Sequence, residues 1–215
     1  MLQYLIRHGE SVSNQAGRVQ GQADVELSAL GKTQAEQVAA WSRGITAVPG
    51  RAVIGEIWSS PLRRARETAA AIAAALGLEV LVEDRLAELH AGIFQGHLWA
   101  DLEERFPEAV ARWRSGDADY AMPGGESRAQ LAARGHAVLE ALAGRDVGRM
   151  IVVAHGGILT AALGSLVGPA HPMLAATAER PFTKLPALAN CSVTRVEWPG
   201  PMLVSFNETG HLPAV

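Results

Sequence analysis

The sequence predicts an α/β protein in which helices cover both faces of a mostly parallel sheet. Three observations lead to this prediction. Short apolar runs alternate with longer helical patterns along most of the chain, the order that parallel sheets require. Residues 150–154 are continuously apolar, as expected of a strand buried on both faces. Glycine or proline residues separate these segments, so each reads as an element of its own.

The composition indicates one globular domain, which we place at residues 1–215 with a helical insertion at about 92–126. Of the 215 residues, 48% are hydrophobic and 19% are charged, so a sizeable core can form and disorder is not expected. The net charge of −3 argues against nucleic acid and anionic membranes as partners. The single Cys191 cannot form an internal disulfide, which is typical of a reducing cytoplasm.

Targeting and metal-binding signals are not evident. Residues 1–6 lack the basic and long apolar segments of a signal peptide, and no apolar run reaches membrane-spanning length. The seven histidines do not show the close spacing of a zinc site. We therefore expect a cytoplasmic protein with no membrane partner and no metal.

The first predicted strand covers residues 2–6 and delivers Arg7 and His8 at its carboxyl end, followed by Gly9 and Asn14. In an open α/β sheet, ligands bind at this end of the strands. An arginine and a histidine beside a glycine suggest an anion site, and the polar Glu10 and Ser11 follow at once. Taken alone, these residues would be explained better by a surface turn that happens to contain a histidine.

The next elements continue the alternation. Residues 17–22 form a polar loop, and Ser28 can cap a helix that runs to about Arg43. Residues 54–58 are the second predicted strand. Ser60 is the predicted N-cap, and Pro61 the first residue, of a helix that ends at Gly77. Three arginines lie in its first turns, where the helix dipole disfavours basic residues: Arg63, Arg64 and Arg66. We therefore expect one of them to reach a site and Glu67 to pair with another.

The middle of the chain contains an acid and a helical cap. A third strand at residues 79–82 leads to Glu88, for which a solvated acid is the simplest local interpretation. The aromatic and apolar residues that follow have helical spacing with a break near Pro107, which predicts a helical cap over one end of the sheet: Trp99, Leu102, Phe106, Ala109 and Trp113.

The last third restores the alternation. Ser127 ends a flexible loop at 123–127 and can cap a helix to about Ala143. The strand at 150–154 places His155 at the start of a helix at 158–167, where anions are favoured. For the proline-rich, irregular segment 169–189, a lid, an oligomer contact such as a homodimer interface and a plain surface loop all stay open. Residues 191–198 and 202–206 form a closing antiparallel pair.

The carboxyl ends of the parallel strands share one edge, so four cationic or nucleophilic side chains should converge there, with Asn14 and Glu88 nearby: Arg7, His8, Arg64 and His155. Two arginines, two histidines and an asparagine suit a tetrahedral dianion. One histidine can act as nucleophile while the other groups hold the phosphoryl oxygens in place of a metal. A carboxylic acid must also protonate the leaving oxygen.

These segments resemble the histidine phosphatase superfamily, also called the phosphoglycerate-mutase-like family. The resemblance spans nearly the whole chain and rests on five motifs in family order and spacing: residues 5–11 with Asn14, 60–65 with Thr68, Glu88 with Gly92 and Gly96, 123–127, and 153–157. An isolated Arg-His-Gly tripeptide would be weak evidence. The resemblance implies a three-layer α/β/α sandwich with a mostly parallel sheet and a helical cap, and neither a metal nor an organic cofactor.

The resemblance also implies the roles of the site residues. His8 attacks phosphorus and becomes phosphohistidine, and the phosphoryl oxygens bind Arg7, Arg64 and His155. Glu88 donates a proton to the leaving group and then takes one from water. In another branch of the family, an aspartate directly after the second histidine is the acid, but here that place is Gly156. We take four residues as substrate-binding: Asn14, Gln20, Gly21 and Gly156. Of these, Gln20 is expected to contact the non-phosphate end of the substrate, together with Arg18.

The two loops at 17–22 and 123–127 resemble the phosphatase branch, which acts on small phosphomonoesters such as sugar phosphates and phosphoglycerates. We therefore expect a metal-independent phosphomonoesterase acting on a small-molecule phosphomonoester. Two alternatives stay open: a 2,3-bisphosphoglycerate-dependent phosphoglycerate mutase, and a catalytically silent phospho-ligand-binding protein. Sequence alone does not name the substrate.

Overall fold

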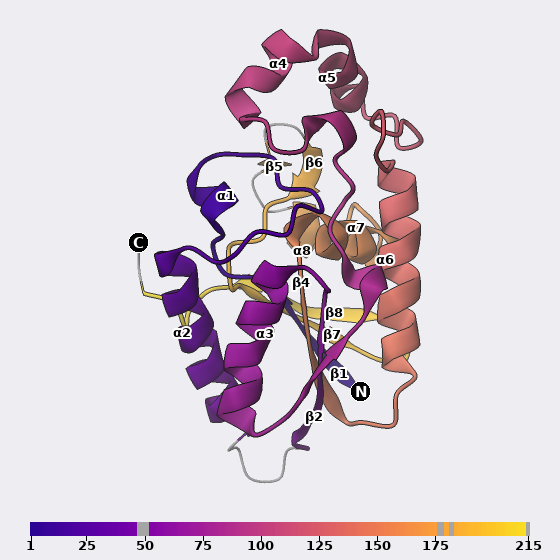
Figure 1. Ribbon diagram of the computed structural model, residues 1–215. Coiled ribbons are helices and arrows are strands. Elements are labelled where there is room, and N and C mark those ends of the chain that lie inside the picture. The colour runs from indigo at the N-terminus through magenta and orange to yellow at the C-terminus, as the bar shows by residue number, and fades with distance from the viewer. Residues whose placement is uncertain (47–51, 176–178, 181–182, 214–215) are drawn as a thin grey trace.

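A mixed sheet lies at the centre of the computed structural model, which describes residues 1–46, 52–175, 179–180 and 183–213. Within those residues the sheet has six strands in the order β3-β2-β4-β1-β7-β8. Helices lie on both of its faces, which confirms the predicted α/β sandwich (Figure 1). The strands are β1 (Leu2–Arg7), β2 (Ile54–Ser59), β3 (Val80–Val82), β4 (Arg149–Ala154), β7 (Val193–Glu197) and β8 (Met202–Glu208).

Four of these strands are parallel to one another. β4 lies between β1 and β2 and pairs in parallel with both, and β2 pairs in parallel with β3. β7 pairs antiparallel with β1, and β8 with β7, as the terminal pair was predicted to do. Every residue of β4 is buried, which agrees with its continuous apolar run.

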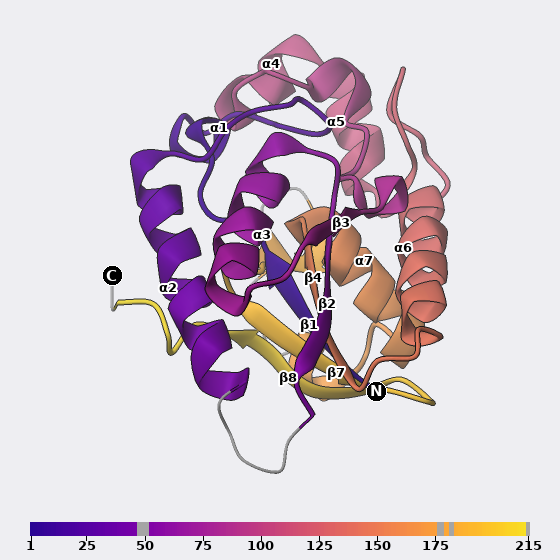
Figure 2. The same cartoon turned by 60° about the horizontal axis from the view of Figure 1, so that its bottom comes forward.

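The four long helices form the two outer layers (Figures 1 and 2). α2 (Ala29–Thr46) and α3 (Arg63–Leu76) cover one face, where Val38 and Ile72 pack with Ile151 of the sheet. α6 (Arg128–Ala143) and α7 (Gly156–Val167) cover the other face, where their apolar residues pack with Val152. α2 and α3 bury one side against the sheet, as amphipathic helices do, whereas α7 is buried without interruption from Ile158 to Leu163.

The cap lies over the carboxyl end of the parallel strands, at the top of Figure 1. Pro107 begins one of its helices, which explains the predicted break in the helical pattern. Phe94, Leu102 and Trp113 form the centre of a separate apolar cluster in the cap. Its short elements are η2 (Gly92–Phe94), η3 (Trp99–Asp101), α4 (Leu102–Arg105) and α5 (Pro107–Arg114).

The helix caps at Ser28, Ser127 and Gly77 agree with the sequence. The Ser28 hydroxyl accepts a hydrogen bond from the Gly31 amide, and Ser127 forms a capping box with Gln130 at the start of α6. Gly77 ends α3 in the left-handed conformation at a φ of 68°.

The predicted start of α3 is wrong. We expected Ser60 as N-cap and Pro61 as the first helical residue, whereas α3 begins at Arg63 after an N-cap at Leu62 that makes no side-chain bond. The Ser60 hydroxyl instead contacts His155, the residue after β4, at 2.7 Å from Nε2. The same hydroxyl also accepts from the Leu62 amide at 3.3 Å, so Ser60 bonds the backbone just ahead of α3 as well as His155.

The segment 169–189 is also more regular than predicted. It contains α8 (Pro172–Ala175) and a two-stranded antiparallel ribbon of β5 (Glu179–Arg180) and β6 (Thr183–Pro186), while residues 176–178 and 181–182 lie outside the described residues. Two further short elements were not predicted, α1 (Val12–Gln15) and η1 (Asp84–Leu86). Among the described residues, no helix combines the length and apolar character needed to cross a membrane.

Candidate active site

A cavity of about 450 Å³ opens between the carboxyl edge of the sheet and the cap. The topology explains what lines it, because β1 ends at Arg7, β4 ends just before α7, and β2 leads into α3. The sequence-predicted residues that line the cavity are Arg7, His8, Asn14, Gln20, Gly21, Arg64, Glu88 and Gly156, and Arg18 lines it as well. The second histidine, His155, is fully buried beside His8, with 5.1 Å between the ring centroids.

His8 is held in the tautomer that a nucleophile needs. Its Nδ1 lies 2.6 Å from the Gly9 carbonyl oxygen, which can only accept a hydrogen bond, so Nδ1 carries the proton. The lone pair is then on Nε2, 3.3 Å from Nε of Arg64. The His8 side chain is 2% exposed, so its orientation is fixed by packing as well.

Arg64 is the buried one of the three arginines, as the crowded helix start predicted. Its side chain is 0% exposed, and its two terminal nitrogens donate to the carbonyls of Ala23 and Gly21 at 2.8 and 2.9 Å. Burial lowers the pKa of Arg64 to about 10, while the nearby Glu88 opposes that change, so the guanidinium keeps its charge at neutral pH. Arg63 instead pairs with Glu26 and Glu67 at the surface.

Arg7 and Asn14 complete the set of polar residues at the sheet edge of the cavity, which we call the polar floor: Arg7, His8, Asn14 and Arg64. Arg7 donates from Nη1 to the Leu188 carbonyl, which ties the end of β1 to the segment before β7. Asn14 accepts through Oδ1 from the Ser11 amide and from Nδ2 of Asn190, at 3.2 and 3.4 Å. These bonds occupy the carbonyl end of the Asn14 amide, so its NH₂ group is available to an anion in the cavity.

His155 presents a donor that has no acceptor among the described residues. The Ser60 hydroxyl accepts from the Leu62 amide at 3.3 Å, so its own hydrogen can go to Nε2 of His155. The His155 proton then sits on Nδ1, a buried atom with no hydrogen-bond partner in the described part of the chain. Burial, followed by the charges of Arg64 and His8, lowers the pKa of His155 well below its usual value, so the ring is neutral at pH 7. A phosphoryl oxygen would satisfy this donor.

Glu88 caps α7 from a distant loop. Its Oε1 accepts from the amides of Leu89 and Ile158 at 2.8 and 3.0 Å, and its Oε2 accepts from Gly157 at 2.9 Å. A Cβ at Gly157 would collide with the Glu88 carboxylate, so a side chain there would have to displace this carboxylate from the helix start. The helix start that we expected to favour an external anion is therefore already occupied by the carboxylate of Glu88.

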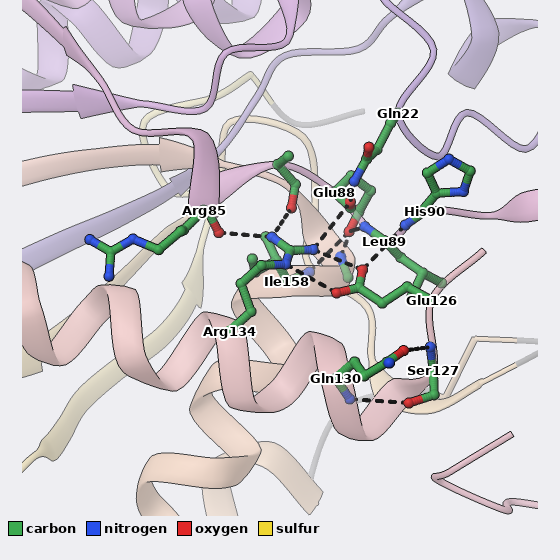
Figure 3. A network of polar contacts seen from close by, with 12 residues as sticks. Gln22, Arg85, Glu88, Leu89, His90, Glu126, Ser127, Gln130, Arg134 and Ile158 are labelled. Carbon is green, nitrogen blue, oxygen red and sulfur yellow. Dashed lines mark hydrogen bonds and ion pairs between the residues drawn. The ribbon is translucent and has the colours of Figure 1, made fainter. Parts of the chain in front are cut away.

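Arg134 of α6 fixes the loop that carries Glu88 (Figure 3). It donates to the backbone carbonyls of Arg85 and Ala87 at 2.8 and 2.7 Å, and more weakly to that of Glu88 at 3.4 Å. The same guanidinium forms a two-pronged pair with Glu126, at 3.0 and 2.8 Å. We call this set, Arg134 with Glu126 and the carbonyls of Arg85, Ala87 and Glu88, the Arg134 clamp.

The loop residues differ in how they reach the cavity. Gln20 accepts from the Ser11 hydroxyl at 2.7 Å, and Gly21 contributes the carbonyl that holds Arg64. Glu10 and Ser11, the polar pair that follows the predicted anion site in the sequence, do not line the cavity: the Glu10 carboxylate accepts from Ser28, and Ser11 caps α1.

Sequence reasoning missed several residues of the site. Ser60 orients His155, Asn190 holds Asn14, and Arg134 holds the Glu88 loop. Only Ser60 carried a usable signal, since it lies two residues after a predicted strand at the binding edge. Among the described residues, no group of three or more His, Cys, Asp or Glu side chains could hold a metal ion.

Two histidines, two arginines, an asparagine amide and a carboxylate meet at the carboxyl edge of the sheet. This arrangement defines an α/β protein with an anion pocket that contains an oriented imidazole nitrogen. Residues 3–208 match the model of the histidine phosphatase superfamily, branch 1, and the chain belongs to that family. The resemblance seen in the five motifs is thus confirmed.

Two curated relatives carry a mutase name. A protein of Photorhabdus laumondii, "Probable phosphoglycerate mutase GpmB", is 38% identical over 92% of this chain and 86% of its own length. A protein of the same name from Yersinia pestis is 36% identical over 99% of this chain and 95% of its own.

Solved structures carry phosphatase names. A mycobacterial glucosyl-3-phosphoglycerate phosphatase matches with a TM-score of 0.78 and 32% identity, covering 97% of this chain and 99% of that one. The phosphoserine phosphatase of Entamoeba histolytica in complex with 3-phosphoglyceric acid matches with a TM-score of 0.78 and 27% identity, over 99% of both chains.

Proposed function

We propose that the protein is a phosphomonoesterase that hydrolyses small phosphorylated molecules through a phosphohistidine at His8, without a cofactor. The observation that supports this most directly is the geometry of His8: Nδ1 is tied to the Gly9 carbonyl and Nε2 faces the pocket cation Arg64. The phosphatase names of two similar solved structures support the same reaction.

In the first step, Nε2 of His8 attacks phosphorus while the bond from phosphorus to the leaving oxygen breaks. Arg7, Arg64 and the Nδ1–H of His155 stabilise the negative charge on the other phosphoryl oxygens. Protonated Glu88 gives its proton to the leaving oxygen, and the alcohol departs.

In the second step, water attacks the phosphohistidine and the bond between nitrogen and phosphorus breaks. The Glu88 carboxylate takes a proton from the water, which restores the starting protonation state and releases inorganic phosphate. The carboxylate in the structure, with both oxygens accepting backbone hydrogen bonds, has the form that this second step needs.

The names of the two curated relatives favour a second candidate, a phosphoglycerate mutase that returns the phosphoryl group to a substrate hydroxyl. Incubation with 3-phosphoglycerate, with and without 2,3-bisphosphoglycerate, separates the two. Release of inorganic phosphate without rapid formation of 2-phosphoglycerate supports the phosphatase. Rapid bisphosphate-dependent interconversion with little free phosphate would replace it with the mutase.

The same protein tests the nucleophile. An acid-labile phosphoenzyme should be trapped from the wild type and not from His8→Ala, which should lose nearly all turnover and remain folded. His136→Ala is the matched control, because that ring bonds Ser165 outside the cavity and should leave both readouts unchanged. Equal labelling of His8→Ala would refute the assignment.

A further inference from the structure

The cavity has two unlike halves. The phosphate end is the polar floor described above, beneath the cap. The distal half is formed by the cap, the loop at 17–22 and α6, and its wall consists of apolar and aromatic side chains: Val19, Phe94, Trp99, Trp113, Met122 and Leu131. A ligand whose phosphate contacts His8 therefore places its alcohol part against this wall.

The wall is preformed. Phe94, Trp113 and Met122 are 2%, 4% and 2% exposed and belong to the apolar cluster of the cap. Leu131 is 1% exposed and belongs to the core under α6. Because these side chains are fixed by packing, binding of an apolar group would need little reordering of the protein.

The polar groups of the distal half are engaged with the protein. Arg18 donates from Nη1 to the Gly96 carbonyl at 2.9 Å. Arg128 donates from Nη2 to the Trp113 carbonyl at 2.7 Å, and its guanidinium lies on the Trp113 ring, 3.9 Å from the centroid. The Thr160 hydroxyl donates to the Gly156 carbonyl at 2.7 Å. The two arginine bonds brace the cap, the Thr160 bond lies within α7, and the rest of the wall is apolar surface.

Resting on the proposed phosphatase activity, we propose that the natural substrates are phosphomonoesters of bulky apolar alcohols, aliphatic or aromatic, and not small charged metabolites. A cavity of about 450 Å³ lies in the range of roughly 300–1,000 Å³ that holds drug-sized ligands. A phosphoryl group with a three-carbon acid would leave most of the apolar wall uncovered.

The test is a series of n-alkyl phosphates from methyl to octyl, whose leaving groups have nearly equal chemical reactivity beyond the first members. Each methylene buried against the wall should raise kcat/KM about fourfold, the factor that corresponds to about 0.8 kcal/mol per methylene, until the cavity is full. A kcat/KM that does not rise with chain length would contradict the proposed substrate class.

A charged comparison checks the alternative that the distal arginines bind an anion. Hexyl phosphate should be a better substrate than its analogue with a terminal carboxylate, because the wall has apolar surface for the chain. A higher kcat/KM for the carboxylate analogue would overturn the proposal in favour of charge recognition by Arg18 or Arg128.

A substitution in the apolar wall tests whether the wall causes the rise of kcat/KM with chain length. Trp99 lies on the rim and is 39% exposed, so Trp99→Ala should fold normally. It should reduce the rise of kcat/KM along the series, with the largest loss for the longest chains. Leu30→Ala, which removes a 49% exposed side chain outside the cavity, is the matched control. An unchanged chain-length dependence in Trp99→Ala would argue against the proposal.

The two proposals fail in different ways. If the enzyme releases phosphate from methyl or glyceryl phosphate as readily as from octyl phosphate, the substrate class is wrong and the phosphatase stands. If neither the alkyl series nor 3-phosphoglycerate gives phosphate or a phosphoenzyme, the phosphatase itself is wrong. Phosphate from 3-phosphoglycerate alone would leave the phosphatase standing and refute the substrate class.

Discussion

At the scale of single residues, three side chains of the candidate site each have a structural reason for their orientation. The Gly9 carbonyl selects the His8 tautomer, Ser60 orients His155, and backbone amides hold both oxygens of Glu88. None of these partners is a charged side chain. These orientations therefore depend on uncharged partners, while the Arg134 clamp additionally holds the loop that carries Glu88.

Glu88→Gln tests the proton transfer. The variant should slow phosphorylation by alkyl phosphates by about 10²–10⁴-fold, because a poor leaving group needs the proton. It should slow phosphorylation by p-nitrophenyl phosphate much less. Rapid-quench measurement of the phosphorylation step with both substrates checks this, and equal losses would remove Glu88 from the role.

A glutamine also offers one acceptor oxygen where Glu88 offers two, so at least one amide of the set loses its partner. We therefore include urea unfolding of Glu88→Gln as a control, with an expected loss of about 1–3 kcal/mol in the free energy of unfolding. The kinetic comparison between two substrates in the same variant is independent of that loss.

How far the sequence predicted the site can be seen at this scale. Arg7 and His8 follow a strand directly, and Arg64 stands out because basic residues are unfavourable at a helix start, so each had a local signal. Arg134 and Asn190 had none. Each acts through a contact with residues 46 or more positions away in the chain, and pairing at that distance leaves no local pattern.

At the scale of elements, the Arg134 clamp joins α6 to the loop between β3 and the cap (Figure 3). Arg134 itself does not line the cavity, so we regard it as a positioning residue that acts through Glu88. Any effect of its loss should appear in the steps that need Glu88.

Arg134→Met should lower turnover of alkyl phosphates by about ten- to a hundredfold and affect phosphorylation by p-nitrophenyl phosphate little, since a displaced acid matters most for a poor leaving group. Steady-state and rapid-quench kinetics measure both effects. Arg145→Met is the matched control, because Arg145 pairs with Glu56 at 2.7 Å on the surface. A uniform loss across both substrates would show that the clamp only stabilises the fold.

Element boundaries were predictable where the local capping signal operates as expected. Ser127, the predicted cap of α6, forms a capping box with Gln130. At α3 the predicted start was two residues too early: Ser60 accepts from the Leu62 amide and also bonds His155, and the helix begins at Arg63.

At the scale of the whole molecule, the fully buried His155 links stability to pH. Its pKa is lowered in the folded protein, so as the pH falls below about 6.5 the unfolded chain binds a proton there that the folded protein does not. The free energy of unfolding should therefore decrease from pH 7 towards the lowered folded pKa. Burial lowers the pKa of His211 as well and adds to the same trend.

Urea unfolding between pH 7.5 and 5 measures this slope. His155→Asn should flatten it, while His136→Asn, a surface substitution, should leave it as in the wild type. An unchanged slope in His155→Asn would show that other groups cause the acid sensitivity.

The alternation of strands and helices predicted the sandwich, but the order β3-β2-β4-β1-β7-β8 is not contained in any local pattern. It follows from long-range pairings such as Leu2 with Arg149. The ribbon of β5 and β6 was missed because two- and four-residue strands are too short to show a periodicity.

The contact of Glu88 with the start of α7 bears on how this site would decay over evolutionary time. A lineage that stopped using the reaction would be free to lose His8, whose ring makes no helix cap. It would be less free to lose Glu88, because removal leaves the amides of Gly157 and Ile158 without their acceptors. Purifying selection for folding alone would then preserve the acid after the activity had gone. In such descendants Glu88 would persist for its structural role alone, and the presence of His8 would distinguish active enzymes from inactive homologues.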